Sequence, residues 1–189
     1  AAGRMDDARI AFNSLIETEH QKVEELAQQL EEWNLLRQQA TREILEAAEQ
    51  FVDGDGPIFA YGEDWHPGVV GLVAGKLAEA TGVPAFVASI HGGIVRGSVR
   101  AQGGVNIVEA LGSCSHILDR YGGHARAGGF TVARSRLFEM RDEVCAWWDT
   151  VGSVRTPPVL EVDCYLWPQS LNWDTLQLVQ DLGPFGESF

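Results

Sequence analysis

The stretch PIFAYGEDWHPGVVGLVAGKLAEATGVPAFVASI, residues 57–90, decides the fold. It begins with a short apolar strand at residues 58–61, and a helix at 68–80 follows with apolar and small residues on one side. A second strand at 85–90 completes the pattern. This order predicts an α/β domain whose sheet carries helices on its faces, and the breakers DGDGP at residues 53–57 mark where it begins.

The same rhythm continues toward the C-terminus. The turn at His91-Gly92-Gly93 sends a third strand back along the second, which predicts a mixed β-sheet flanked by helices. After the Pro157-Pro158 pair we expect the start of a further module. The expected elements are strands at 94–100 and 130–133, helices at 107–121 and 136–150, and in the further module a strand at 159–166 and a helix at 172–182.

Upstream of the sheet, apolar residues recur at three- and four-residue steps from 14 to 51, without proline. This predicts a long amphipathic helix, or two in series, whose role is to connect or pack rather than to bind a ligand. Residues 1–13 start without an initiator Met or a helix cap. We expect them to be the end of a preceding domain, and the chain to be a fragment.

Bulk composition sets limits on the class of protein. No run of about 18 apolar residues occurs and no signal peptide is recognisable, so we expect a soluble, cytoplasmic protein without a membrane partner. The 3 cysteines, Cys114, Cys145 and Cys164, are widely spaced and form no CxxC pair. They predict buried free thiols rather than disulfides or a zinc site.

The net charge of −13 at first argues against a nucleic-acid partner. However, residues 91–141 carry seven arginines and three acidic residues, whereas the chain's only lysines are Lys22 and Lys76. Arginine binds phosphate with two parallel hydrogen bonds. An arginine-lined strip in an acidic chain favours a narrow anionic ligand over unselective binding of duplex DNA.

Three glycine-rich segments combine small residues with polar ones. In the first, residues 63–71, Trp65 and His66 precede a helix whose free N–H groups could accept an anion. Close packing of that helix on the sheet is the favoured explanation of its glycines, and approach of a ligand is the alternative. We take Trp65 and His66 as possible loop contacts with a ligand.

The second segment is GIVRGSVR, residues 93–100. Side chains alternate along a strand, so Arg96, Ser98 and Arg100 share one face and form a candidate phosphate clamp. Gly97 would let a backbone or ligand come near. The alternative is a solvated strand face.

The third segment is YGGHARAGGF, residues 121–130, which we expect to be a turn. Its density of small residues indicates that something bulky comes close to the backbone. His124 is the candidate for contact with a phosphate or a metal-bound group, and Gly122, Gly123 and Arg126 are candidate strand contacts. A structural histidine in a tight turn is the alternative.

Together these segments, with NIVEAL at residues 106–111, resemble in order and spacing the DHH-associated domain of the RecJ-type exonucleases. The GGHxxAAG-type motif is shared across the DHH phosphoesterase superfamily, whereas WHPGVVGLVA and GSVR are more specific to RecJ. The resemblance implies four regions. They are the end of a DHH domain (1–13), a connecting helix (14–52), the DHH-associated nucleic-acid-binding domain (53–152) and the start of an OB-fold (153–189).

The resemblance also implies the function: hydrolysis of single-stranded DNA from the 5′ end, in DNA repair and recombination. Two Mn²⁺ or Mg²⁺ ions would be bound by an N-terminal DHH domain that this chain lacks, because it contains no Asp-His-His triplet and its possible metal ligands look isolated. Partners would be single-stranded DNA, a single-strand-binding protein and a helicase. Arg4, Ser98 and Arg100 would bind phosphates, and His124 would face the metal site as a catalytic residue.

Two other functions remain open from the sequence. A DHH phosphodiesterase for short oligonucleotides or cyclic dinucleotides carries a similar GGH turn, although such enzymes usually end near the associated domain. A non-catalytic nucleic-acid-binding or replication-scaffold protein is the other alternative. Arg126 inside the motif, and Gly128-Gly129 where Ala-Gly is commoner, depart from the family pattern.

Overall fold

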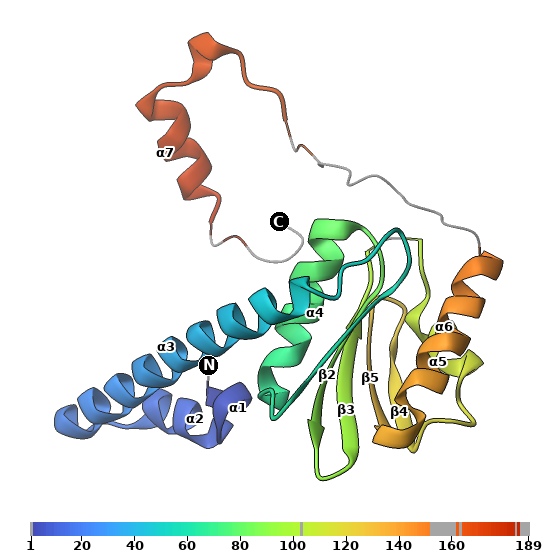
Figure 1. The fold of residues 1–189 in the computed structure, drawn as a ribbon. Helices are drawn as coiled ribbons and strands as arrows, with labels where there is room; N and C mark the ends of the chain where they lie inside the picture. The colour runs from blue at the N-terminus through green and yellow to red at the C-terminus, as the bar shows by residue number, and fades with distance from the viewer. Residues whose placement is uncertain (1, 103, 152–161, 163, 184, 186–189) are drawn as a thin grey trace. The chain divides into compact units, whose positions relative to one another are not determined.

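The computed structural model describes residues 2–102, 104–151, 162, 164–183 and 185. Contacts divide the chain into two units, residues 1–157 and residues 158–189. The first unit contains the sheet and the second the short C-terminal elements (Figure 1).

The first unit is organised by a five-stranded sheet with the strand order β1-β2-β3-β5-β4. β1 (Ile58–Glu63) and β2 (Ala85–His91) are parallel, as expected for strands joined by a helix. β3 (Ile94–Arg100), β5 (Ala127–Ala133) and β4 (Arg120–His124) follow in antiparallel pairs. The predicted mixed sheet is therefore confirmed.

Helices cover both faces of this sheet (Figure 1). On one face α4 (Pro67–Thr81) packs on β2 and β3, and it builds an apolar cluster with residues such as Val73 and Val87. On the other face α5 (Ile107–Ser113) and α6 (Leu137–Val151) cover a cluster that includes Val95 and Val99. A 3₁₀ turn, Arg134–Arg136, leads into α6.

The bounds of α4 follow from local chemistry. His66 is its N-cap and accepts a hydrogen bond from the Gly68 backbone N–H through Nδ1, at 3.1 Å. Pro67 occupies the first turn, where its missing N–H costs nothing. Gly82 ends the helix in the left-handed conformation, with φ of 72°. The predicted helix at 68–80 is confirmed.

The N-terminal segment forms helices in series rather than one continuous helix. α1 (Ala2–Met5) and α2 (Ala8–Ile16) precede the long α3 (His20–Glu49). Asp7 caps α2, so helix extends into the part of residues 1–13 that was expected to be only a tail. α3 packs against α4 and buries Thr41, Ile44 and Ala48 near its C-terminal end.

One predicted element is wrong over part of its length. The helix expected at 107–121 ends at Ser113, and Arg120–His124 is the edge strand β4. Backbone pairing with β5 replaces helical hydrogen bonds there: the Asp119 N–H donates to the Thr131 carbonyl at 2.9 Å. Long-range pairing thus overrides a local apolar pattern.

The second unit contains a 3₁₀ turn, Pro168–Ser170, and α7 (Trp173–Asp181), which confirms the helix expected at 172–182. Asn172 caps α7 by accepting a hydrogen bond from the Thr175 N–H. The expected strand at 159–166 is wrong for residues 162 and 164–166, and its other residues lie outside the described ranges. The OB-fold start and the four region boundaries stay predictions.

Among the described residues, every helix is too short or too polar to cross a membrane.

Candidate nucleic-acid interface

The predicted phosphate clamp lies on one face of β3. Arg96, Ser98 and Arg100 alternate with Val95 and Val99, whose side chains are buried beneath α5 and α6. The clamp therefore faces the same side of the sheet as α4. A Cβ added to Gly71 of α4 would lie 3.2 Å from Ser98 Oγ and 3.2 Å from Arg100 Nη2, so this helix borders the clamp.

The strand register extends the clamp across β5 and β4, because directly paired residues point to the same side of a sheet. Three rows of side chains result, which are Arg100 with Ala127 and His124, Ser98 with Gly129 and Gly122, and Arg96 with Thr131 and Arg120. We call Arg96, Ser98, Arg100, Arg120 and His124 the basic strip. Two strand spacings separate the Arg100 and His124 Cα atoms, about 10 Å.

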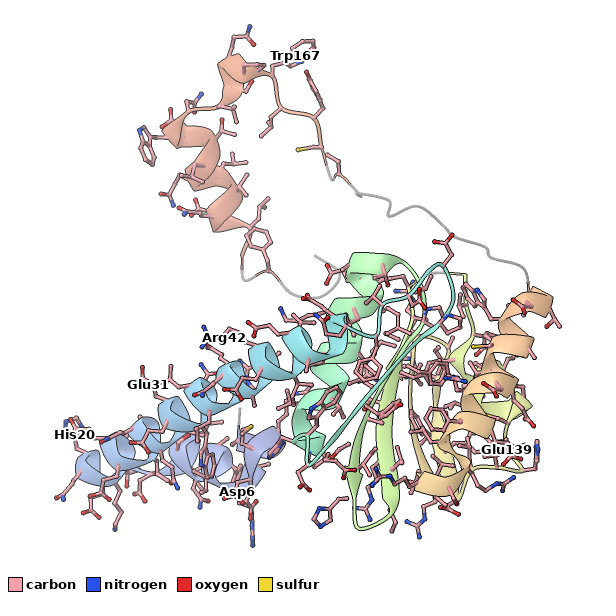
Figure 2. The ribbon with its side chains drawn as sticks, in the orientation of Figure 1. Asp6, His20, Glu31, Arg42, Glu139 and Trp167 are labelled. Carbon is pink, nitrogen blue, oxygen red and sulfur yellow. The ribbon has the colours of Figure 1, made fainter. Side chains whose placement is uncertain are left out.

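The basic strip contains no acidic residue. Every residue that β3, β5 and β4 place on this face is basic, small, apolar or a hydroxyl residue, although the whole chain has a net charge of −13. The acidic side chains are instead frequent on the long N-terminal helix, where Glu31 is labelled in Figure 2. The sequence placed most arginines in residues 91–141, and the structure collects three of them with His124 on one face of the sheet that carries no acidic residue.

Arg100 is the most constrained cation of the strip. It is partly buried, and its Nη1 donates to the Val99 carbonyl at 2.8 Å. Burial lowers the pKa of Arg100, and the positive charge of Arg4 lowers it further. Arg4 is itself held to α4 by a hydrogen bond from Nη1 to the Gly68 carbonyl, at 3.3 Å. Within the described ranges neither guanidinium pairs with a carboxylate, so an anion bound between them would relieve their repulsion.

The glycines of the third segment have two separate roles. A Cβ on Gly122 would meet nothing within 4 Å, and one on Gly129 would approach only the Gly97 carbonyl, at 3.6 Å. These two glycines keep the floor of the basic strip open, beside a hollow of about 290 Å³ along β5. In contrast, Gly123 and Gly128 are required by the fold, because a Cβ there would collide with Ala127 and Leu111.

His124 ends β4 rather than lying in a turn. Ala125 and Arg126 form the hairpin connection to β5, and their carbonyls accept hydrogen bonds from the Ile107 N–H at 2.9 Å and the Ala101 N–H at 3.1 Å. This anchoring fixes the backbone beside His124. Arg126 is exposed at the hairpin tip and is not one of the three rows, so the structure does not place it with the basic strip.

The two loop candidates have structural roles of their own. His66 caps α4 as described above, which satisfies its Nδ1. Trp65 packs its indole over Gly62, where a Cβ would collide with the ring. Gly97 is likewise filled from within the fold, because Phe130 occupies the space that a ligand was expected to approach.

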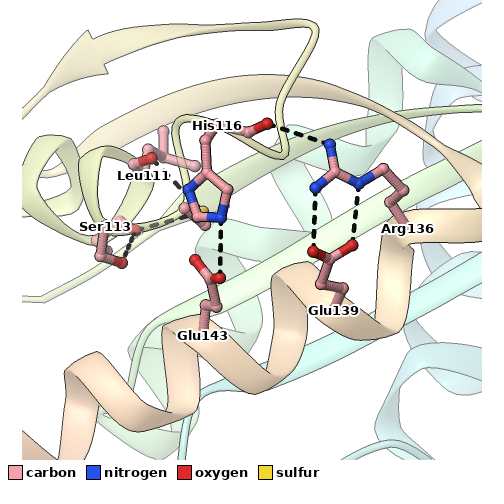
Figure 3. Close-up of polar contacts among 8 residues, drawn as sticks. Leu111, Ser113, His116, Arg136, Glu139 and Glu143 are labelled. Carbon is pink, nitrogen blue, oxygen red and sulfur yellow. Dashed lines mark hydrogen bonds and ion pairs between the residues drawn. The ribbon is translucent and has the colours of Figure 1, made fainter.

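A second polar cluster lies between α6 and the loop that follows α5 (Figure 3). These two helices cover the face of the sheet opposite the basic strip. His116 Nε2 lies 3.1 Å from Glu143 Oε1, and Arg136 binds both carboxylate oxygens of Glu139, at 2.9 and 3.0 Å. Arg136 also holds the loop by donating to the His116 carbonyl. Its hydrogen bonds lower the pKa of Glu139.

The ligand atoms of His116, Glu139 and Glu143 lie within 4.8 Å of one another. The expectation that every possible metal ligand in this chain is isolated is therefore wrong for these three residues. The cluster does not fit a nuclease centre with two metal ions, because it offers one histidine and two glutamates, and Arg136 already neutralises Glu139.

Two polar residues, one in the basic strip and one beside it, were not predicted from the sequence. Arg120 was assigned to a helix, although its alternation with Gly122 and His124 is typical of a strand face. Ser89 lies in an otherwise apolar strand and carried no signal, yet the register places it beside Arg96.

The family model of the DHHA1 domain matches residues 54–149. The single-stranded-DNA-specific exonuclease RecJ of Bacillus subtilis (strain 168) is 33% identical over 199 residues, covering 98% of this chain and 25% of that relative. The RecJ of Escherichia coli (strain K12) is 28% identical over 206 residues, covering 100% of this chain and 35% of the relative.

Among solved structures, RecJ from Thermus thermophilus in complex with Mg²⁺ superimposes with a TM-score of 0.81 and 30% identity, covering 98% of this chain and 29% of that one. Its complex with Mn²⁺ gives the same TM-score and identity. The chain thus spans between a quarter and about a third of the length of these relatives. The matched residues 54–149 contain the complete sheet with α4, α5 and most of α6, and the chain belongs to the DHHA1 domain family.

Proposed function

We propose that the chain is the strand-binding region of a single-stranded-DNA-specific 5′-to-3′ exonuclease. One observation carries the proposal: a surface with three arginines and a histidine but no carboxylate, on a glycine floor, in an otherwise acidic chain. A phosphodiester backbone is the ligand that such a surface matches in charge. The names of the RecJ relatives support the same substrate.

In this proposal Ser98 and Arg100 bind phosphates near the 5′ end of the strand, and Arg4 adds its charge beside them. Arg96 and Arg120 bind phosphates further along the strip. Gly122 and Gly129 let the backbone of the strand lie close to the sheet. His124 contacts the scissile or neighbouring phosphate, and Arg126 reaches the strand from the hairpin tip.

The proposal assigns cleavage to two Mn²⁺ or Mg²⁺ ions bound outside this chain, in a preceding DHH domain. Their chemistry is activation of a water and stabilisation of the phosphodiester transition state. The complexes of the Thermus relative with Mg²⁺ and Mn²⁺ support a divalent ion, and the mismatch of the His116 cluster supports its location elsewhere. A cytoplasmic location, and a single-strand-binding protein and a helicase as partners, belong to the same proposal.

Arg100→Ala tests the binding role. The salt dependence of affinity for a 5′-phosphorylated oligonucleotide should become shallower, by about 0.7 in the slope of log K against log salt, because one phosphate contact is lost. Arg141→Ala is the matched control, since Arg141 lies on α6 next to Asp142, away from the basic strip. Equal slopes in wild type and Arg100→Ala would refute the clamp.

The location of the metal ions is tested with the wild-type chain. With Mn²⁺ it should bind labelled single strands without shortening them. Measurable turnover would place a metal centre within these residues and contradict the proposal.

A further inference from the structure

A pocket of about 300 Å³ opens where β1 and β2 end and α4 begins. It is lined by Asp64, Trp65, Pro67, Ser89, His91, Ile94 and Arg96. Its volume is at the lower end of the range of small-molecule sites, roughly 300–1,000 Å³, and suits a single aromatic ring system.

Ser89 supplies a polar group in the wall of the pocket. Its side chain lies at the pocket wall and only 7% of the residue is exposed. The hydroxyl makes no hydrogen bond to any residue in the described parts of the chain. No buried side-chain nitrogen or oxygen of the described residues lacks a hydrogen-bond partner, so this hydroxyl is open to solvent through the pocket. It can therefore exchange a bound water for a polar group of a ligand.

The walls are flat and largely apolar. Asp64 adopts a left-handed backbone conformation, with φ of 54°, and this sharp turn places the Trp65 indole over Gly62. Pro67 and Ile94 complete the apolar lining. At the rim, His91 Nδ1 lies 2.7 Å from Asp64 Oδ1, which holds that carboxylate in place.

The pocket continues the basic strip. The register places Gly62, Ser89, Arg96, Thr131 and Arg120 in one row across all five strands. Arg96 belongs both to the strip and to the pocket lining. A strand whose phosphates lie along β3 therefore passes the mouth of the pocket.

We propose that this pocket receives one nucleobase of the bound strand, an inference that rests on the proposed function. A base offers a flat face to Trp65 and a polar edge to the Ser89 hydroxyl and the Asp64 carboxylate. A phosphate is the poorer occupant, because most of the lining is apolar and Asp64 would repel it. Arg96 binds the phosphate that precedes or follows the inserted base.

The test uses this chain and a series of 5′-phosphorylated oligothymidines, each with one abasic nucleotide at a different position. For the wild type, one abasic position should weaken binding about tenfold, because a stacked base is lost. Ser89→Leu, which fills the pocket, should weaken binding of the intact oligonucleotide by a similar factor. The abasic substitution should then cost nothing further.

Trp65→Leu should behave like Ser89→Leu, and Trp65→Phe should restore part of the affinity because the stacking face returns. Circular dichroism and thermal melting identify variants that fold. If no abasic position is sensitive, or if both folded pocket variants bind like wild type while Arg100→Ala still flattens the salt dependence, the pocket inference alone is wrong. If Arg100→Ala has no effect either, the proposed function fails as well.

Discussion

Gly71 of α4 and Arg100 of β3 approach each other so closely that a Cβ on Gly71 would lie 3.2 Å from Arg100 Nη2. The same Cβ would lie 3.2 Å from Ser98 Oγ. These contacts are tighter than ordinary van der Waals distances, so both polar ends would have to move by a few tenths of an ångström. The helix therefore sets the position of the clamp, and Gly71 leaves the room it needs.

Gly71→Ala should accordingly reduce affinity for a 5′-phosphorylated single strand several-fold. The fold should tolerate it, because alanine favours a helix by about 1 kcal/mol over glycine and the displaced groups are side-chain ends. Gly75→Ala is the matched control, since a Cβ at Gly75 meets nothing within 4 Å on the same helix. Oligonucleotide titration and thermal melting separate the two effects, and equal affinities of the two variants would contradict the role of Gly71.

Gly128 and Gly129 are neighbours in β5, but replacing each with alanine should affect different properties: stability for Gly128 and strand binding for Gly129. A Cβ on Gly128 would lie 2.8 Å from Leu111 Cδ1 and 3.0 Å from Ile107 Cγ2, so Gly128→Ala overpacks the core and should lower the free energy of unfolding by about 1–3 kcal/mol. Gly129→Ala has room and should leave stability almost unchanged. It should instead weaken strand binding, because the methyl group stands on the floor of the basic strip.

Urea denaturation and oligonucleotide titration of both variants check this division. If Gly129→Ala loses stability and keeps full affinity, the open floor is not a binding surface.

The sequence predicted the fold well where local and long-range preferences agree. Breakers and apolar runs located β1, α4, β2 and β3, because these elements have clear ends such as the His66 cap and Gly82. It failed at β4, where the segment before Gly122 is apolar enough to continue α5. Only pairing with β5 determines that Arg120–His124 is extended.

In the candidate site, too, local patterns were predicted correctly and contacts that depend on long-range packing were not. Alternation on a single strand grouped Arg96, Ser98 and Arg100 correctly. The neighbourhood of Arg4, Gly71 and Arg100 depends on how α1 and α4 pack, which no local pattern reports. Glycine density indicated close approach, but only the structure separates Gly122 and Gly129, which are open, from Gly123 and Gly128, which are packed.

His124→Ala should impair cleavage more than binding in a protein that contains the proposed DHH domain together with this chain. Removing a group that stabilises developing charge on a phosphate typically lowers kcat by about 10²-fold. KM should change little, because Arg96, Ser98 and Arg100 still hold the strand. Single-turnover kinetics on a 5′-phosphorylated oligonucleotide measure the chemical step, and Arg141→Ala, on α6 and away from the basic strip, serves as the control. A rise in KM with unchanged kcat would reduce His124 to a binding residue.

The cysteines provide a test of the core. Cys114 is fully buried at the end of α5, Cys145 is partly buried, and Cys164 is exposed, so the expectation of buried thiols is wrong for Cys164. Burial raises the pKa of the Cys114 thiol to about 11, and the negative charge of Glu143 contributes. Alkylation at pH 8 should therefore modify Cys164 first, Cys145 more slowly and Cys114 only on unfolding.

Because the pKa of Cys114 is raised in the folded state, the free energy of unfolding should decrease at alkaline pH. The pKa of Cys114 is higher in the folded state than the usual 9.0, so its contribution is complete below pH 9 and is lost as pH rises toward about 11. In that window the unfolded chain releases the proton first, and unfolding becomes easier. The urea concentration at the midpoint of unfolding should therefore fall more steeply between pH 8 and 11 for the wild type than for Cys114→Ala. The variant still contains the lysines, tyrosines and Cys145, so the difference between the two slopes reports Cys114 alone. Parallel slopes would mean that Cys114 is not held as a neutral thiol beneath α6.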